Sequence, residues 1–169
     1  MIKFYPHIKP YSRPIVDLSD QLNPYWVSGF VAGDGGFSVI VKETEENKFK
    51  DVHYGLYITQ SIRDIELIKK FVEFFKCGRV YKINITSNKS VFAIQDLQSI
   101  LYKVIPHFDK YNLENSKQLD FLCYKKAIFI IKSKNHFTKE GIQKIKSLSS
   151  KINSNRRKIS NESFKNSKL

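Results

Sequence analysis

A glycine-rich stretch near the N-terminus constrains this chain more than any other feature. Residues 23–36 read Asn-Pro-Tyr-Trp-Val-Ser-Gly-Phe-Val-Ala-Gly-Asp-Gly-Gly. Asn23 is a favourable helix N-cap, and Pro24 fits the first turn, where its missing N–H is not needed. Gly29 and Gly33 each cost roughly 1 kcal/mol of helix propensity relative to alanine, and residues four apart share one helix face. The stretch therefore predicts a helix with one face that is almost bare of side chains.

A bare helix face allows a second backbone to approach closely, so we expect this face to pack against its own copy. The residues predicted to form that dimer interface are Ser28, Gly29, Ala32 and Gly33. Asp34 follows at the C-terminal end of the helix, before an alternating apolar strand that begins at Phe37. A carboxylate in that place suggests an acidic site shared by two copies. The simpler alternative is a helix with glycine C-caps, followed by a turn into a strand.

Composition indicates one domain with a polyanionic partner. The chain has 169 residues and a net charge of +13, and residues 132–169 hold eleven Lys and Arg against two acids. The longest aliphatic–aromatic run, Ala127 to Ile131, is far too short to span a membrane. Cys77 and Cys123 form no metal-ligand spacing and no disulfide framework. We therefore expect no membrane association and a reducing compartment.

Periodicity predicts an α+β fold with the element order αββαββα followed by C-terminal helices. Strands are expected at 37–44, 52–60, 79–85 and 90–95, and helices at 62–76, from Asp96 to Pro106, from about Ser116, and at 138–152. Gly78 is expected to end the second helix. The long helix that starts near Ser116 is expected to bury Leu119, Leu122, Cys123, Ala127 and Ile130. These boundaries give an N-terminal extension (1–21), one domain (22–152) and a basic flexible tail (153–169).

The string Val27–Gly35 resembles the LAGLIDADG signature of homing endonucleases. Asp34 matches the second acidic position of that signature, whereas Ala32 occupies the first. Similar blocks follow at 58–60 and 108–121, and a stretch at 136–142 resembles C-terminal segments of fungal organellar members. The chain has a single copy of the motif, so the resemblance is to the homodimeric class.

This resemblance implies a four-stranded antiparallel, saddle-shaped sheet and a metal-dependent DNA endonuclease. Asp34 and the Gly33 carbonyl would bind Mg²⁺, or Mn²⁺ or Ca²⁺ in its place. Gln60 would order a metal-bound or nucleophilic water, and Lys117 would polarise solvent or stabilise charge on the phosphate. Without the resemblance, Gln60 reads as a strand cap and Lys117 as an exposed lysine in a first helical turn.

The sheet face away from the helices would follow the major groove of double-stranded DNA, which admits a β-ribbon. The residues predicted to point to the DNA are Ser38, Ile40, Lys42, Thr44, His53, Tyr57, Arg79 and Tyr81. Two-fold symmetry would make the long target site pseudo-palindromic.

Three other functions stay open on the sequence. An intron maturase, with intron RNA as its partner, has the same fold and needs no intact acidic site. A non-catalytic DNA-binding module fits the missing first acid at Ala32. A basic ribosome-associated protein explains the tail but not the glycine helix. The abundance of Ile, Lys, Phe and Asn, with only three Ala, fits an organellar genome, so we expect a mitochondrial protein ahead of a chloroplast one.

Overall fold

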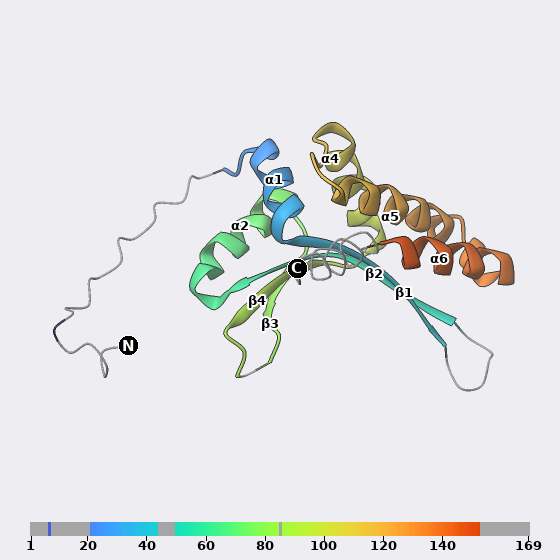
Figure 1. Ribbon diagram of the computed structural model, residues 1–169, viewed down its shortest axis with the longest axis horizontal. Helices are drawn as coiled ribbons and strands as arrows, with labels where there is room; N and C mark the ends of the chain where they lie inside the picture. The colour runs from blue at the N-terminus through green and yellow to red at the C-terminus, as the bar shows by residue number, and fades with distance from the viewer. Residues whose placement is uncertain (1–6, 8–20, 44–49, 85, 153–169) are drawn as a thin grey trace, which may run out of the picture.

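A curved antiparallel sheet of four strands forms the centre of the protein (Figure 1). The computed structural model describes residue 7 and residues 21–43, 50–84 and 86–152. The strands are β1 (Gly35–Glu43), β2 (Lys50–Ser61), β3 (Arg79–Lys82) and β4 (Lys89–Ile94), in the spatial order β1-β2-β4-β3. Each neighbouring pair is antiparallel, which confirms the predicted sheet.

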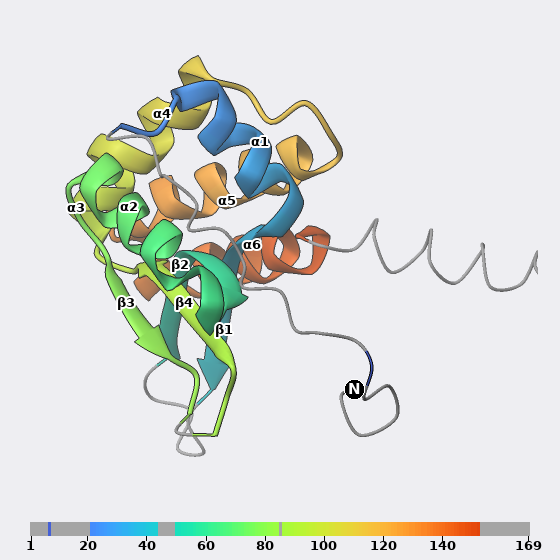
Figure 2. The same ribbon diagram turned by 90° about the vertical axis from the view of Figure 1, so that its left-hand side faces the viewer.

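The helices gather on one face of this sheet (Figure 2). They are α1 (Pro24–Asp34), α2 (Ile65–Phe75), α3 (Leu97–Ser99), α4 (Ile105–Lys110), α5 (Lys117–Lys132) and α6 (Lys139–Lys151). Short turns lie at η1 (Ile62–Asp64), η2 (Ile100–Val104) and η3 (Asn135–Phe137). This order confirms the predicted αββαββα arrangement with C-terminal helices, an α+β fold.

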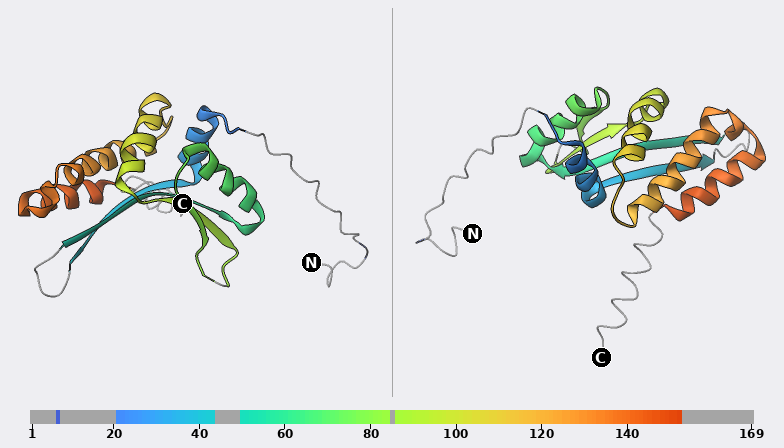
Figure 3. Two further views of the ribbon diagram at one scale, coloured as in Figure 1. Left: turned by 180° about the vertical axis from the view of Figure 1, so that it is seen from behind. Right: turned by 90° about the horizontal axis from the view of Figure 1, so that it is seen from above.

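The two halves of the sheet carry different helices. α5 and α6 contact β1, and α2 contacts β4, as the view from above in Figure 3 shows. Within the described ranges no helix covers the opposite face, which we call the open face; it arches away from the helices in Figure 1. None of the described helices combines the length and the apolar character needed to cross a membrane.

The core fills the space between the sheet and the helices. Phe37, Leu56 and Phe92 from the strands and Phe71 and Phe121 from the helices are all at most 2% exposed. Full burial of such a side chain stabilises the fold by about 1.5–3 kcal/mol. Because this apolar side of the sheet is occupied by the core, the open face is left for other contacts.

The C-terminal end of α2 differs from the prediction by one residue, and a different residue ends the helix. The helix ends at Phe75, and Lys76 takes the left-handed conformation with φ 52°, two residues before Gly78 with φ 86°. Gly78 was expected to end the helix, so that prediction is wrong. A methyl group on Gly78 would also lie 2.6 Å from the Phe92 ring, so glycine is needed there for a close approach as well as for its backbone conformation.

Proline does not end the helical segment after Asp96, which is a second difference. Asp96 caps α3 as predicted, because its Oδ1 accepts the Ser99 N–H at 3.0 Å. The chain then widens into a π-helical turn, in which the Ile105 N–H bonds to the Ile100 carbonyl. Pro106 lies in the first turn of α4, where its missing N–H is tolerated, so the helical path continues to Lys110.

The buried face of α5 also differs from the prediction. Leu119 is 53% exposed and Leu122 is 41% exposed, whereas Lys117 and Asp120 are buried. Apolar residues occur on every side of this helix, so their spacing alone does not select a face. Of the predicted set Ala127 is buried, and Cys123 and Ile130 are half-buried.

The predicted flanking regions are not tested by the structure. Almost all of the extension 1–21 and all of the tail 153–169 lie outside the described residues, as does Thr44.

Candidate active site

Helix α1 begins as the sequence predicts. The Asn23 Oδ1 atom accepts the N–H groups of Tyr25 and Trp26 at 2.9 and 3.3 Å. Val27 and Val31 are fully buried against the core, which fixes the orientation of the helix about its axis. Caps of this type stabilise a helix by about 1 kcal/mol.

The opposite side of α1 is bare. Gly29 and Gly33 are both exposed, and a methyl group added to either would meet no atom of this chain within 4 Å. Packing within the chain therefore does not require glycine at these positions, although each glycine lowers helix propensity. Together with half-buried Ala32 they form what we call the bare face of α1.

Ser28 does not belong to the bare face, contrary to the prediction. It is 3% exposed, and its hydroxyl donates to the Tyr111 carbonyl at 2.7 Å. The same oxygen lies 3.2 Å from Nε2 of His107 on α4. Burial lowers the pKa of His107 from 6.5 to about 4, so the imidazole is neutral near pH 7. Ser28 thus ties α1 to its own chain.

The chain passes from α1 into β1 without a loop. Asp34 is the last helical residue and Gly35 the first strand residue, two positions before the predicted strand start at Phe37. A methyl group on Gly35 would come within 2.7 Å of Val31 Cγ1 and 2.9 Å of Val31 Cα. Glycine at this position therefore allows β1 to begin directly against the last turn of α1. The Asp34 backbone is held between the helix on one side and the strand on the other.

Side chains from one short segment bind the carbonyls at the end of α1. Lys117, the first residue of α5, is 2% exposed and donates from Nζ to the carbonyls of Val31 at 2.9 Å, Gly33 at 3.3 Å and Gly35. Asn115 Nδ2 donates to the Ala32 carbonyl at 3.0 Å. The last carbonyls of a helix lack intrahelical partners, and a positive charge is favourable beside them. The alternative of Lys117 as an exposed first-turn lysine is therefore wrong.

Asp34 and Gln60 meet at this same end of the sheet. Gln60 Nε2, near the end of β2, donates to Asp34 Oδ2 at 2.7 Å, and the Asp34 side chain is exposed to solvent. The β1–β2 register, with Gly35 opposite Ile58, brings the two residues together. The structure thus brings together the three residues predicted to act in catalysis at the C-terminal end of α1. Lys117 lies on the buried side of this helix end, and Asp34 and Gln60 lie on its solvent-exposed side.

Oxygen atoms at this end suit a hard divalent cation, but one chain offers few of them. An exposed carboxylate from Asp34 and the Gly33 carbonyl are ligands of the kind that Mg²⁺ prefers. In the part of the chain that is described, no group of three or more His, Cys, Asp or Glu side chains lies close enough to hold a metal. Mg²⁺ is commonly bound through one or two carboxylates, with water molecules and substrate phosphates as its other ligands.

The open face carries every described residue that was predicted to point toward DNA. Strand pairing sets Ile40 opposite His53 and Arg79 opposite Ala93, which itself lies opposite Tyr57. Alternation along the strands places the rest on the same side: Ser38, Ile40, Lys42, His53, Tyr57, Arg79 and Tyr81. The structure adds Gln95, directly after β4, which donates to the Tyr57 hydroxyl at 2.8 Å. No sequence signal marked Gln95, because its place on this face follows only from the β2–β4 register.

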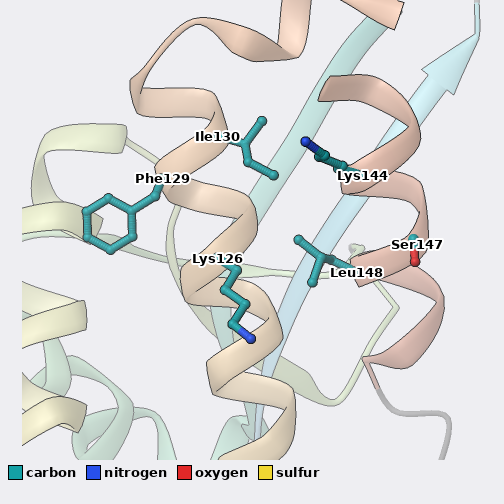
Figure 4. Close-up of a pocket in the computed structure, with 6 residues that line it drawn as sticks. All are labelled: Lys126, Phe129, Ile130, Lys144, Ser147 and Leu148. Atoms are coloured by element: carbon teal, nitrogen blue, oxygen red, sulfur yellow. The ribbon is translucent and has the colours of Figure 1, made fainter. Parts of the chain in front are cut away.

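Two of the hollows outside the open face differ in their relation to the site. One, of about 250 Å³, adjoins the bare face and is lined by Tyr25, Gly29, Ala32, Asn112, Glu114 and Asn115. The other, of about 430 Å³, lies between α5 and α6, where Ile130 and Leu148 face each other with Lys144 beside them (Figure 4). None of the predicted site residues lines the second hollow, whereas Gly29 and Ala32 of α1, the helix that carries Asp34, line the first.

The family model of the LAGLIDADG endonuclease matches residues 27–128, which include Asp34, Gln60 and Lys117. The chain belongs to this family. The match begins at Val27, the first of the nine signature residues, so the resemblance in the sequence is confirmed.

Two fungal proteins are among the relatives of this chain. The chain is 35% identical over 122 residues to a probable intron-encoded endonuclease 2 of Neurospora crassa, covering 71% of this chain and 25% of the relative. It is 34% identical over 137 residues to a probable intron-encoded endonuclease 3 of the same organism, covering 80% and 26%. This chain therefore spans about a quarter of the length of these relatives.

Solved LAGLIDADG structures share the fold. The homing endonuclease I-SmaMI bound to cleaved DNA superposes with a TM-score of 0.82 at 30% identity, over 92% of this chain and 52% of that chain. I-GzeII in complex with its DNA target gives a TM-score of 0.78 at 33% identity, over 90% and 51%. I-SmaMI has also been solved on an uncleaved target with calcium ions, at a TM-score of 0.81. The chain thus corresponds to about half of each of these structures.

Proposed function

We propose that this LAGLIDADG chain is a homing endonuclease, which hydrolyses both strands of a specific DNA site as a homodimer. The observation that carries the proposal is the place of Asp34: an exposed carboxylate at the end of a helix whose neighbouring face is bare. Gln60 holds that carboxylate at 2.7 Å, and the open face extends from the same end of the sheet. The DNA-bound structures of I-SmaMI and I-GzeII support DNA as the partner.

Two copies would meet through the bare faces of α1. Gly29 and Gly33 leave open space that the chain itself does not use, and the hollow lined by Tyr25 and Asn115 lies beside them. Contact between two such faces would bring the two Asp34 carboxylates near one axis, so that each serves one DNA strand. Two like charges repel each other there, which favours a cation between them.

Each catalytic residue has a proposed role. Asp34 and the Gly33 carbonyl would hold Mg²⁺, which when bound lowers the pKa of a water molecule and neutralises the leaving oxygen. Gln60 would orient water beside Asp34 through the part of its amide that the carboxylate does not use. Lys117 is 2% exposed and binds three backbone carbonyls, so we propose a positioning role for it in place of the predicted contact with solvent or phosphate. Its charge would offset the negative end of α1 and keep the Asp34 backbone in place.

The relatives support an organellar setting for this chain. Several of them are described as intron-encoded, and they come from fungi such as Neurospora crassa. We infer an organellar intron as the source and the mitochondrion as the location, with a long pseudo-palindromic target near the insertion site of that intron. The exposed Asp34 favours cleavage over a maturase or a purely DNA-binding role, because neither of those needs a solvent-facing carboxylate.

Asp34→Asn tests the catalytic role. Target DNA is first selected from a randomised duplex library by binding, and cleavage is then measured with Mg²⁺. We expect Asp34→Asn to keep target binding and to lose cleavage, because phosphate and base contacts remain while a metal ligand is removed. The matched control is Asp64→Asn, which removes one exposed carboxylate from η1 and should cut at the wild-type rate. Cleavage retained by Asp34→Asn would refute the assignment of the site.

Gly29→Leu tests the homodimer. A leucine on the bare face would force apart two backbones in contact, and overpacking of this kind typically costs about 1–3 kcal/mol or more. Light scattering should show a wild-type dimer and a folded Gly29→Leu monomer. Lys69→Leu on the exposed side of α2 adds the same side chain elsewhere and should remain dimeric. A wild-type protein that binds its target as a monomer would exclude the homodimer.

A further inference from the structure

Three side chains on the open face form one hydrogen-bonded chain across three strands. Arg79 of β3 donates from Nη2 to Gln95 Oε1 at 2.6 Å. Gln95, which follows β4, donates from Nε2 to the Tyr57 hydroxyl of β2 at 2.8 Å. The amide of Gln95 thus uses its oxygen toward one partner and its nitrogen toward the other.

Small residues under this chain make the bridge possible. Ala93 lies opposite both Tyr57 and Arg79 in the strand register, so only a methyl group stands between them. A methyl group on Gly55 would lie 2.9 Å from two ring atoms of Tyr57, which shows that the tyrosine ring lies over this glycine. The Tyr57 ring therefore packs on the Gly55 backbone, which holds the tyrosine hydroxyl in place as the acceptor for Gln95.

Arg79 is restrained from a second side. Its guanidinium carbon lies 5.6 Å from the centre of the Tyr81 ring, within the range of a cation–π contact. Gln95 takes one of the five N–H donors of the guanidinium, so the others remain for an outside acceptor. Among the described residues, Arg79 is the one arginine on the open face, since Arg63 lies in η1.

We propose that Gln95 is a specificity-determining residue, which positions Arg79 to read one guanine in each half of the DNA target. This inference rests on the proposed function, in which the open face contacts the major groove. Arginine recognises guanine by donating two hydrogen bonds to O6 and N7, and that geometry requires a correctly oriented guanidinium plane. An arginine already held by Gln95 and Tyr81 loses less freedom on binding than a mobile one, so the correct base gains more from it.

The proposal makes the effect local. Gln95 has no charge to offer a phosphate, and its amide already binds Arg79 and Tyr57. Removing it should therefore relax base preference at the position that Arg79 reads. Non-specific affinity and its dependence on salt, which reflect phosphate contacts, should stay unchanged.

Base preference of Gln95→Ala, measured position by position against a library of single-substituted targets, tests the inference. We expect discrimination for guanine to fall about five- to fifty-fold at one position of each half-site, and Arg79→Ala to abolish preference at that same position. Tyr57→Phe keeps the ring over Gly55 and removes only the far hydrogen bond, so it should give a smaller loss there. Gln98→Ala, an exposed glutamine on α3, is the control and should change no position.

Three results would overturn it. The first is full discrimination by Gln95→Ala at every position of the target. The second is that Gln95→Ala and Arg79→Ala affect different positions. The third is that Gln95→Ala weakens binding to all sequences equally. If the wild type itself showed no target preference, the proposed function would fail as well. A wild type that cuts one target, together with an unaltered Gln95→Ala profile, would refute this inference alone.

Discussion

Replacing Lys117 with methionine should destabilise the protein strongly. Methionine keeps most of the volume of the side chain and removes the ammonium group, so the carbonyls of Val31 and Gly35 would lose their buried donor. A buried hydrogen bond to a charged group contributes about 1.5–3 kcal/mol. The Val31 carbonyl keeps the backbone N–H of Gly35 as a partner, so only its bond to the charged group is lost. Two such bonds, with the weaker one to Gly33, predict a loss of about 3–5 kcal/mol in the free energy of unfolding.

Urea denaturation followed by circular dichroism measures that loss. For a protein of this size the loss corresponds to a fall of roughly 2–3 M in the urea midpoint. The matched control is Lys125→Met, eight residues further along α5, which removes a partly exposed ion pair with Asp109. Pairs of that kind contribute about 0–1 kcal/mol, so the control should shift the midpoint little. Equal midpoints for the two variants would refute the idea that Lys117 caps α1.

Three further results are expected from the structure. Burial lowers the pKa of His107 to about 4, so below pH 6.5 the unfolded chain binds a proton at this residue that the folded protein does not bind. The free energy of unfolding should therefore fall by on the order of 1–2 kcal/mol as the pH drops from 6.5 to 4. Urea titrations at each pH measure this dependence, which His107→Phe should reduce. Gly35→Ala should lower the free energy of unfolding by about 1–3 kcal/mol, because the added methyl group would collide with Val31. Gly33→Ala should leave the free energy of unfolding of the monomer unchanged or raise it slightly, because its methyl group would meet no atom. Thermal unfolding compares the two, and equal effects would contradict the close contact between Gly35 and Val31. Residues 153–169 carry five Lys and Arg against one acid, so deleting them should weaken binding to target and random DNA alike. Fluorescence anisotropy should also show a smaller dependence of binding on salt. Loss of discrimination between the two DNAs, with non-specific affinity unchanged, would contradict this prediction.

The parts of the fold that follow local chemistry were predictable. Asn23 and Pro24 mark the start of α1 because capping depends on adjacent residues. Gly29 and Gly33 mark its bare face because helical spacing is fixed. Strand alternation likewise predicted which side chains of β1 reach the open face, since successive residues in a strand point to opposite sides.

The parts that depend on distant contacts were not predictable in the same way. Ser28 is small and was expected on the bare face, but α4 lies beside it and accepts it into a buried contact. Lys117 and Asp120 are charged and nevertheless lie on the buried side of α5, because the end of α1 supplies the partners of Lys117. Gln95 gained its place from strand pairing, which no local pattern encodes. Sequence therefore identified the residues of the candidate site better than it identified their surroundings.

The contacts at the C-terminal end of α1 determine when during folding the candidate site is completed. The carbonyls at the end of α1 are bound by Asn115 and Lys117, which lie 83 and 86 residues later in the chain than the residues they contact. Contacts of such long range require the closure of a long loop, and they form late because its entropic cost precedes their reward. During synthesis, a nascent chain that has completed α1 and the sheet still lacks the donors that fix the backbone around Asp34. Any nuclease chemistry of this site therefore becomes available only after α5 has docked, so an incomplete chain cannot present the finished end of the helix.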